Sequence, residues 1–179
     1  SGISPTMNLV HKVEVSYTES GSFSTDLNRL EGKTDGWMDN VHTLRDTYCA
    51  DMVGLLINNS SACGLASAIM ANESEAFQVT HWDCATGYYS FAHEFGHLQG
   101  ARHDWAADPT NNSPFTYNHG YVNPSLGWRT VMAYNNSACI GGYCDRLLYW
   151  SNPDITYGGV PLGVQEGSYH AEDNKKTIN

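Results

Sequence analysis

The first half of the chain contains four short hydrophobic stretches of the kind that forms β-strands. They cover residues 10–17, 52–57, 64–70 and 77–82. In the first of them, Val13, Val15 and Tyr17 alternate with polar residues, as in a strand with one covered face. The second lacks polar side chains, which is typical of a central strand covered on both faces. The pattern therefore predicts a small β-sheet.

Helices are predicted between and after these strands. They cover residues 35–48, a segment that begins near Thr86 or Ser90 and ends at about Gly100, and residues 171–178. The chain after Asp104 is rich in Asn, Pro and Gly, which is typical of loops. No repeat or low-complexity linker interrupts the sequence. We therefore expect residues 1–179 to form a single domain, with an upper subdomain over about 1–103 and a lower, loop-rich subdomain over about 104–179.

The segment from residue 93 to residue 104 carries the most specific pattern. It reads His-Glu-Phe-Gly-His-Leu-Gln-Gly-Ala-Arg-His-Asp. Positions four apart share one face of a helix with about 3.6 residues per turn, so His93 and His97 can bind the same metal ion. His103 lies too far along a straight helix to reach that ion. Gly100 permits the required turn, because a residue without a Cβ adopts positive φ at a helix end.

Three histidines in this arrangement predict a catalytic zinc site. Three neutral imidazoles leave the fourth position of a tetrahedral zinc open for water, whereas structural sites are closed. Zinc lowers the pKa of that water to about 7, and Glu94 is placed to take its proton during attack on a carbonyl. The alternative is a chance His-Glu-x-x-His on an ordinary amphipathic helix. Gly100 and His103 argue against it, because a chance motif requires neither.

The longer motif resembles that of the metzincin clan of zinc endopeptidases, in which a methionine-containing turn beneath the metal follows the third histidine. The resemblance implies that Met132, within Thr-Val-Met-Ala-Tyr at residues 130–134, is the Met-turn residue. Tyr134 matches the spacing at which some metzincins place a tyrosine near the metal, where it would hydrogen-bond the developing oxyanion. A half-buried tyrosine with a solvated hydroxyl is the alternative. Asp104 is similar to a structural acid of the reprolysin-like branch that anchors the loop below the helix.

Within that branch, the chain is similar to secreted bacterial enzymes of the peptidyl-Asp metalloendopeptidase type. The segments that carry this likeness are 35–51, 63–66, 84–90 and 149–153. The resemblance implies an α/β (α+β) zincin fold, with a mixed, twisted sheet and an active-site helix above a loop-rich C-terminal subdomain. It also implies a secreted zinc endopeptidase that acts on polypeptides and prefers acidic residues at the cleavage site.

The resemblance also implies how a substrate binds. In the family, an extended peptide adds a strand to the sheet edge, and Gly64, Leu65 and Ala66 are the candidate edge in this chain. A buried substrate carboxylate needs a charged partner, and Arg129 and Arg146 are the candidates for that role. Both arginines are equally compatible with surface positions.

Composition and charge narrow the classes of partner. At 179 residues, with 41% hydrophobic and 12% aromatic content, the chain is large enough to bury one compact core. A net charge of −10 and a pI near 5.0 argue against nucleic acid and anionic membranes and suit basic or neutral polypeptides. No apolar run approaches the roughly 20 residues that cross a bilayer. Asp and Asn side chains offer calcium ligands, but no loop matches an EF-hand, so calcium is not indicated.

Five cysteines allow two disulfides and leave one thiol. Cys139 and Cys144 flank a short glycine loop that a disulfide would close. Cys63 and Cys84 would join the edge-strand region to the entrance of the zinc helix. Such pairs imply an oxidising, extracellular setting. Cys49 would then be free, and we expect it to be a small buried thiol at the end of the predicted helix.

The start of the chain departs from the family pattern. The related enzymes are expected to have a strand and a long helix before the strand predicted at 10–17, whereas only nine residues precede it. Either those elements have been cut away or lie on another chain, or the sheet is rebuilt without them. An unpaired edge invites association with another strand, so a dimer or a retained N-terminal companion fragment is an expected partner.

Two other functions are compatible with the zinc motif. A metzincin-like binding or adhesion module would keep zinc as a structural staple without turnover, but such a site has no use for Glu94 beside an open coordination position. A zinc hydrolase that acts on bonds other than peptides is disfavoured by the Met-turn candidate, Met132, through the resemblance alone.

Overall fold

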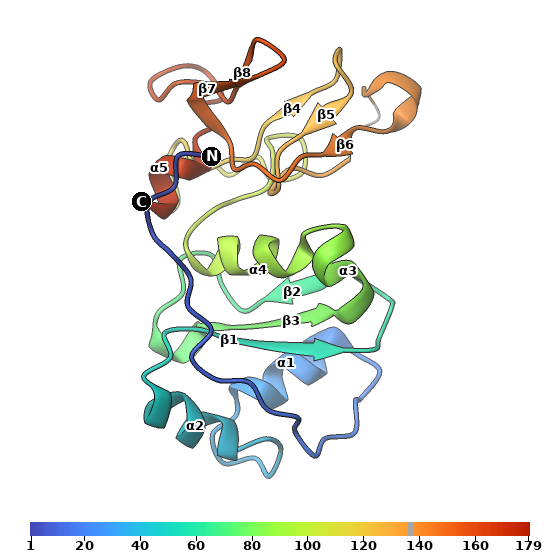
Figure 1. The fold of residues 1–179 in the computed structure, drawn as a ribbon, viewed down its shortest axis with the longest axis vertical. Coiled ribbons are helices and arrows are strands. Elements are labelled where there is room, and N and C mark those ends of the chain that lie inside the picture. Colours follow the sequence, from blue (N-terminus) through green and yellow to red (C-terminus); the bar gives the residue numbers. More distant parts are fainter. Residues whose placement is uncertain (136–137) are drawn as a thin grey trace. The chain divides into compact units, whose positions relative to one another are not determined.

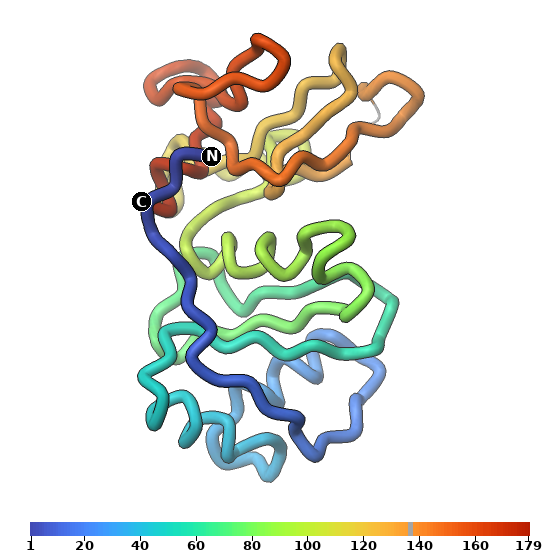
Figure 2. The backbone as a smooth tube through the Cα atoms, in the orientation of Figure 1, coloured from blue at the N-terminus to red at the C-terminus, as the bar shows by residue number. Residues whose placement is uncertain are grey.

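The computed structural model describes residues 1–135 and 138–179 and divides them into two compact units, each of which is described by itself (Figure 1, Figure 2). The N-terminal unit consists of residues 6–98. The C-terminal unit consists of the described residues of 99–179 together with residues 1–5. That residues 1–179 act as a single catalytic domain stays a prediction.

The N-terminal unit is built on a three-stranded sheet. Its strands are β1 (Val53–Ile57), β2 (Gly64–Ala66) and β3 (Phe77–His81). Their order is β1-β3-β2, with β3 parallel to β1 and antiparallel to β2. The expected mixed sheet is therefore confirmed, and β2 lies at an edge, as expected for the residues from Gly64 to Ala66. The strand predicted over 64–70 ends at Ala66.

The prediction that residues 52–57 form the central strand is wrong. In the described sheet β1 pairs only with β3, and Leu56 is 54% exposed. The central position belongs to β3, where Phe77 and Val79 are fully buried. A continuous apolar run shows that a strand has little contact with water in part of its length, but it does not show how many neighbours the strand has.

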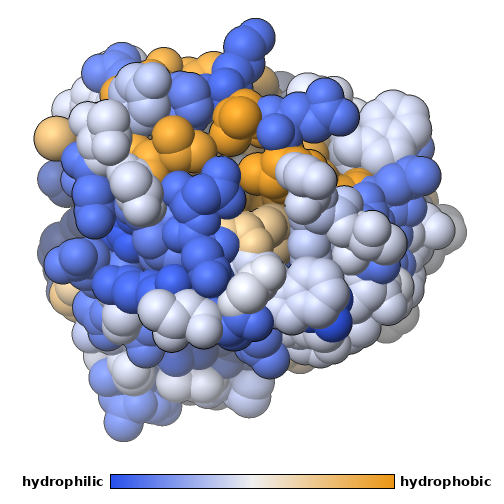
Figure 3. Space-filling view, turned by 90° about the horizontal axis from the view of Figure 1, so that it is seen from below, coloured by the Kyte–Doolittle hydropathy of each residue, from blue (hydrophilic) through white to orange (hydrophobic). Residues whose placement is uncertain are grey.

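Helices cover both faces of this sheet (Figure 1). One face carries α1 (Phe23–Glu31) and α2 (Asn40–Tyr48), and the other carries α3 (Trp82–Gly87) and α4 (Ser90–Leu98); a short 3₁₀ helix, η1, spans Glu73–Glu75. Seen from the side of α1 and α2, the surface is mostly hydrophilic, with a smaller group of hydrophobic residues gathered at a hollow (Figure 3). On this side of the sheet, α1 directs Phe23, Leu27 and Leu30 into the core.

Helix α1 is not predicted from the sequence. The Ser22 side chain accepts a hydrogen bond from the backbone N–H of Thr25 and caps its first turn. Phe23, Leu27 and Leu30 follow the i, i+4, i+7 spacing of one helix face and are buried in the core with Phe77 and Val79 of β3. Burying each such side chain is worth roughly 1.5–3 kcal/mol.

The strand predicted over 10–17 is also wrong, because these residues are extended but pair with no described strand. Val15 and Tyr17 pack against the core, whereas Val13 is exposed. The Tyr17 hydroxyl also donates to a carboxylate oxygen of Asp26 on α1, at 2.5 Å. An alternating pattern thus indicates that the side chains on one side of an extended segment are buried. It does not indicate whether the backbone of that segment pairs with another strand.

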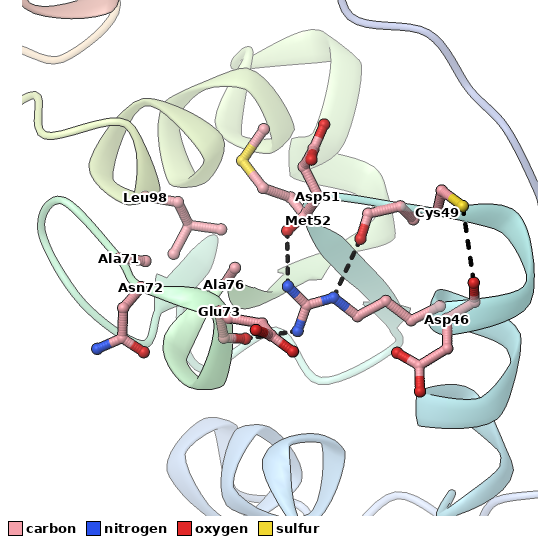
Figure 4. A pocket seen from close by; sticks show the side chains of 11 residues that line it. Asp46, Cys49, Asp51, Met52, Ala71, Asn72, Glu73, Ala76 and Leu98 are labelled. Carbon is pink, nitrogen blue, oxygen red and sulfur yellow. Dashed lines mark hydrogen bonds between the residues drawn. The ribbon is translucent and has the colours of Figure 1, made fainter.

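Helix α2 begins five residues later than predicted, since Gly36 and Met38 adopt positive φ and interrupt any helix before Asn40. After α2, Cys49 takes the left-handed conformation and is exposed, so the prediction of a buried thiol is wrong. The turn directs Cys49 to the surface, where it lines a shallow pocket (Figure 4).

Arg45 lines that pocket and links the segments around it. Its guanidinium donates hydrogen bonds to the backbone carbonyl oxygens of Ala50, Glu73 and Asp51, at 3.1, 2.5 and 2.8 Å (Figure 4). These bonds join the end of α2 to η1 and to the start of β1. The arginine is therefore a structural cation, and none of the three motif histidines lines this pocket.

The C-terminal unit is rich in loops, as predicted. Its elements are β4 (Val122–Asn123), β5 (Trp128–Arg129), a 3₁₀ helix η2 (Ile140–Gly142), β6 (Asp145–Arg146), β7 (Asn152–Tyr157), β8 (Val160–Leu162) and α5 (Asn174–Ile178). The strands form one sheet of order β4-β5-β6 and one antiparallel pair, β7-β8. The helix predicted over 171–178 is shorter, because Asp173 caps it by accepting from the N–H of Lys176.

Both predicted disulfides are confirmed, Cys63–Cys84 in the N-terminal unit and Cys139–Cys144 in the C-terminal unit. The first fixes the residue before β2 to α3, and the second closes the loop around η2. Among the described residues, no helix combines the length and the apolar character that a bilayer span requires.

Candidate metal centre

Helix α4 carries the first half of the zinc motif on its buried side. His93, Glu94 and His97 are 4%, 6% and 8% exposed. The two imidazole rings lie one helical turn apart, with 4.8 Å between their centroids. The backbone N–H groups of Met70 and Ala71 donate to the carbonyl oxygens of His97 and Leu98, each at 2.9 Å. Two of the free carbonyls at the end of α4 therefore accept hydrogen bonds from the segment that follows β2.

The chain turns where the sequence requires it to turn. Helix α4 ends at Leu98, and Gly100 has φ of 101°. Its carbonyl oxygen accepts a hydrogen bond from the side-chain amide of the fully buried Asn118, at 2.5 Å. The predicted turn at Gly100 is thus confirmed, with the helix ending two residues before it, and a buried amide holds the turn in place.

His93, His97 and His103 come together in the folded chain. One nitrogen from each ring lies within 4.8 Å of the other two. Small side-chain rotations from this spacing bring three imidazoles onto one ion, whose bonds to imidazole nitrogen are about 2.0–2.1 Å long. The three histidines are therefore able to hold a metal ion, and an all-imidazole donor set suits zinc.

The surroundings of His103 keep its ring in the neutral form that binds metal. Burial lowers the pKa of His103 to about 4, and the positive charges of Arg146 and Arg102 act in the same direction, against an opposing effect of Asp108. A neutral ring at physiological pH has a lone pair available for a metal, so no proton has to be displaced before binding.

Tyr134 and Asp104 border the third histidine. The ring of Tyr134 lies 4.1 Å from that of His103, centroid to centroid, and Tyr134 is 48% exposed. Asp104 is buried, and its carboxylate accepts from the backbone N–H groups of Tyr134, Ala106 and Ala107, at 2.8, 3.1 and 3.3 Å. Asp104 therefore anchors the loop after the motif and fixes the backbone of Tyr134, as the resemblance implied for this acid.

His119 is a supporting residue to which the sequence alone assigns no role. It is fully buried, with ring nitrogens 2.7 Å from the carbonyl oxygen of His103 and 2.8 Å from that of Thr110. Its ring also stacks on Trp105, at 3.7 Å between centroids. His119 therefore lies directly against the backbone of the third motif histidine. In the sequence, the nearest signal is only its position in a loop after the motif.

Replacing His119 with phenylalanine is expected to weaken zinc binding by about tenfold, the lower end of the range for residues that support a metal ligand. Phenylalanine keeps the stack on Trp105 and removes the contacts of the ring nitrogens with the carbonyl oxygens of His103 and Thr110. The measurement is a competition titration against a chromogenic chelator. His170→Phe is the matched control, because His170 stacks on Trp105 too but is exposed. Wild-type zinc affinity in His119→Phe would contradict this expectation.

The other predicted residues lie in different surroundings. Met132 is fully buried between Val131 and Ala133, and its assignment as a Met-turn residue stays a prediction. Arg129 is 5% exposed and donates to the carbonyl oxygens of Cys144 and Ala133, at 3.0 and 2.6 Å. Arg129 is therefore occupied within the fold, contrary to a surface position.

Arg146 is half-buried and donates to the carbonyl oxygen of Ala133 at 3.4 Å, and its charge acts on His103. Residues 136–137, which lie between Arg129 and Arg146 in the sequence, are outside the described residues. In the N-terminal unit, Leu65 and Ala66 lie on the edge strand β2, and Gly64 lies directly against Glu94.

Comparisons with known proteins agree with this site. The reprolysin model of metallo-peptidase family M12 matches residues 3–151. Proteins named peptidyl-Asp metalloendopeptidase are similar to the chain. One from Stenotrophomonas maltophilia is 52% identical over an alignment of 181 positions, which covers 99% of this chain and 41% of that protein. The one from Xanthomonas campestris is 55% identical, over 91% of this chain and 38% of that protein. The one from Pseudomonas fragi is 46% identical, over 79% of this chain and 70% of that protein.

A solved structure gives the same result for the fold alone. The chain is similar to one described as "Structure of a chaperone-substrate complex", with a TM-score of 0.62 and 24% identity, over 89% of this chain and 23% of that one. The chain spans about two fifths of the length of the Stenotrophomonas and Xanthomonas relatives. The family model covers most of the sequence, and the relatives carry the corresponding name, so the chain belongs to metallo-peptidase family M12.

Proposed function

We propose that this protein is a zinc-dependent endopeptidase that cleaves polypeptides at aspartate. The observation that carries the proposal is the approach of His93, His97 and His103 to within 4.8 Å, with Glu94 buried next to the first of them. Membership of family M12 implies zinc, and the relatives' name, peptidyl-Asp metalloendopeptidase, supports aspartate as the recognised residue.

Each residue of the site has a task in peptide hydrolysis. Bound zinc would supply Lewis acidity, which polarises a peptide carbonyl and acidifies water. Glu94 accepts a proton from the attacking water and passes it to the leaving amine nitrogen, as a general base and then a general acid. The burial of Glu94 excludes bulk water from this transfer. The hydroxyl of Tyr134 donates a hydrogen bond to the oxyanion that develops on the carbonyl.

Two features support the roles of Tyr134 and Met132. The side chain of Tyr134 is half-exposed and lies against the ring of His103. Asp104 accepts a hydrogen bond from the backbone N–H of Tyr134, which fixes the position from which this side chain extends. Met132 is fully buried two residues earlier, as a Met-turn residue beneath a metal would be. We therefore assign oxyanion stabilisation to Tyr134 and a structural role to Met132.

The edge strand β2 offers a surface for an extended substrate. Within the described sheet β2 pairs on one side only, with β3, so its other edge can accept a peptide strand. Main-chain pairing with Leu65 and Ala66 would hold any extended peptide, and a pocket would select its side chain. Arg146 is the better of the two candidate cations for a substrate carboxylate, because the guanidinium of Arg129 is buried and donates to two backbone carbonyls.

The two disulfides support an extracellular location. Disulfides persist in oxidising compartments, and the structure has two of them, one beside β2 and one at η2. The net charge of −10 is compatible with a secreted protein that meets basic or neutral polypeptides.

The test is a map of cleavage sites in a mixed peptide library, read by mass spectrometry. We expect cuts beside aspartate that disappear when zinc is chelated and return when zinc is restored. Arg146→Ala is expected to lower kcat/KM for aspartate peptides, relative to matched asparagine peptides, by at least about tenfold, since a charge-assisted hydrogen bond is lost. Arg29→Ala, on α1, is the matched control and is expected to keep the preference.

The outcomes separate the parts of the proposal. Cuts without an aspartate preference would refute the specificity and leave the peptidase activity. An unchanged preference in Arg146→Ala would remove Arg146 from the pocket. No cuts by folded, zinc-loaded protein would refute the activity and favour a binding or adhesion module with a structural zinc.

A further inference from the structure

Gly64 and Glu94 share a space that only one side chain can fill. A Cβ built on Gly64 would lie 2.4 Å from Oε1 of Glu94, 2.6 Å from its Cγ and 2.7 Å from its Cδ. Carbon atoms in contact are normally about 3.5–4.0 Å apart. The carboxylate and stem of Glu94 therefore occupy the volume that any side chain at position 64 would take.

The backbone gives no other reason for glycine at this position. Gly64 lies in β2, pairs in register with Thr80 of β3, and is not among the glycines with positive φ. An alanine at position 64 can adopt the same extended backbone without strain. The contact with Glu94 is thus the feature that distinguishes glycine from alanine here.

Strand β2 is held and cannot retreat from Glu94. The Cys63–Cys84 disulfide ties the residue before Gly64 to α3, and the carbonyl oxygen of Cys63 accepts from the N–H of His81 at 3.0 Å. Beyond β2, Met70 and Ala71 donate to the last carbonyls of α4. Since both ends of the β2 segment are fixed to the sheet and to α3 or α4, a new side chain at position 64 is accommodated by movement of Glu94.

The required movement of the Glu94 side chain is short, but it is expected to lower the catalytic rate strongly. Relieving a 2.4 Å contact to ordinary separation requires a shift of about 1 Å. The three atoms nearest to the new Cβ all belong to the flexible side chain of Glu94, from Cγ outward, and none is a backbone atom, so folding stability changes little. A misplacement of about 1 Å in a catalytic arrangement costs about 100-fold in rate.

We propose that Gly64 is a positioning residue for Glu94. Because Gly64 has no side chain, the carboxylate of Glu94 can occupy the space beside β2 and stays next to His93. This inference rests on the proposed function, because it assigns Gly64 to the proton transfer carried out by Glu94. It differs from a role of Gly64 in binding substrate, which would act on KM.

The central experiment is Gly64→Ala, assayed with a fluorogenic aspartate peptide. We expect kcat to fall about 100-fold, with KM within about twofold of wild type. Zinc content and the visible spectrum of the cobalt-substituted protein are expected to be unchanged, because the three histidines are untouched. Thermal unfolding is expected to stay close to that of the wild type.

A matched glycine in the same sheet controls for crowding. Gly54 lies in β1, and a Cβ on it would come equally close, 2.4 Å, to the side-chain nitrogen of Gln78. Gly54→Ala is therefore expected to keep kcat close to that of the wild type, because the side chain that it displaces is Gln78 and not Glu94. An equal fall of kcat in both variants would show that general disturbance of the sheet is responsible and would overturn the proposal.

A double-mutant cycle separates positioning from substrate blocking. If Gly64→Ala acts by displacing the Glu94 carboxylate, adding it to Glu94→Ala changes the residual rate less than about twofold, since coupled residues are not additive. A further 100-fold loss in that background, a rise in KM, or wild-type kcat in Gly64→Ala would each overturn the inference. Inactive wild-type protein, or full activity in Glu94→Ala, would instead refute the proposed function.

Discussion

Replacing Glu94 with glutamine is expected to lower kcat for peptide hydrolysis by about 10³-fold, within the range for loss of a general acid–base group. Glutamine has nearly the size of glutamate and fits the same buried space against Gly64, so packing is kept while the group that accepts a proton is lost. The measurement is steady-state hydrolysis of a fluorogenic aspartate peptide, together with zinc content by elemental analysis. Zinc content is expected to stay at the wild-type value, since Glu94 is not one of the three ligands.

The matched control for this variant is Glu14→Gln, which removes the same charge from an exposed residue outside the site. We expect its kcat to equal that of the wild type. If Glu94→Gln retains more than about a tenth of the wild-type kcat, Glu94 is not the proton acceptor. A zinc site without turnover in either protein would instead fit the adhesion-module alternative.

The metal centre was predictable because its geometry is local. His93 and His97 are one helical turn apart, and Gly100 is the residue that lets the chain turn before His103. Both conditions follow from local backbone geometry over the 11 residues from His93 to His103, so they are predictable without the rest of the fold. The two disulfides were predictable for a related reason, since each joins residues that flank a recognisable loop or element.

Features that depend on distant parts of the chain were predicted less well. The alternation at Val13, Val15 and Tyr17 is the same for a paired strand and for an extended segment that packs on a core, and the fold uses the second. Residues 52–57 are apolar enough for a central strand, yet β3 takes that position. Neither outcome is determined by periodicity, because strand neighbours are a property of the whole sheet.

Supporting residues were the hardest to find. His119 lies against the carbonyl oxygen of His103, 16 residues earlier. Gly64 lies against Glu94, which is far from it in sequence. The proposed role of Gly64 depends on its lack of a Cβ atom. Sequence motifs show the residues that carry out the chemistry, whereas the residues that position them become visible only when distances are known.

Replacing His103 with alanine is expected to abolish turnover and to weaken zinc binding at least about 100-fold, since one of three protein ligands is lost. The measurements are zinc content after dialysis against micromolar zinc and the shift in unfolding temperature on zinc addition. Zinc present at 1,000 times its Kd stabilises the wild-type fold by about 4 kcal/mol. Most of this stabilisation is expected to disappear in His103→Ala.

His170→Ala is the matched control, because it removes an exposed histidine of the same unit that is not one of the three ligands. It is expected to keep both zinc content and the zinc-dependent shift. His103 also distinguishes the long motif from a chance His-Glu-x-x-His, which would require only His93 and His97. If His103→Ala still holds one tightly bound zinc and turns over peptide, another donor completes the site, and the position of His103 near the other two rings has no role in catalysis.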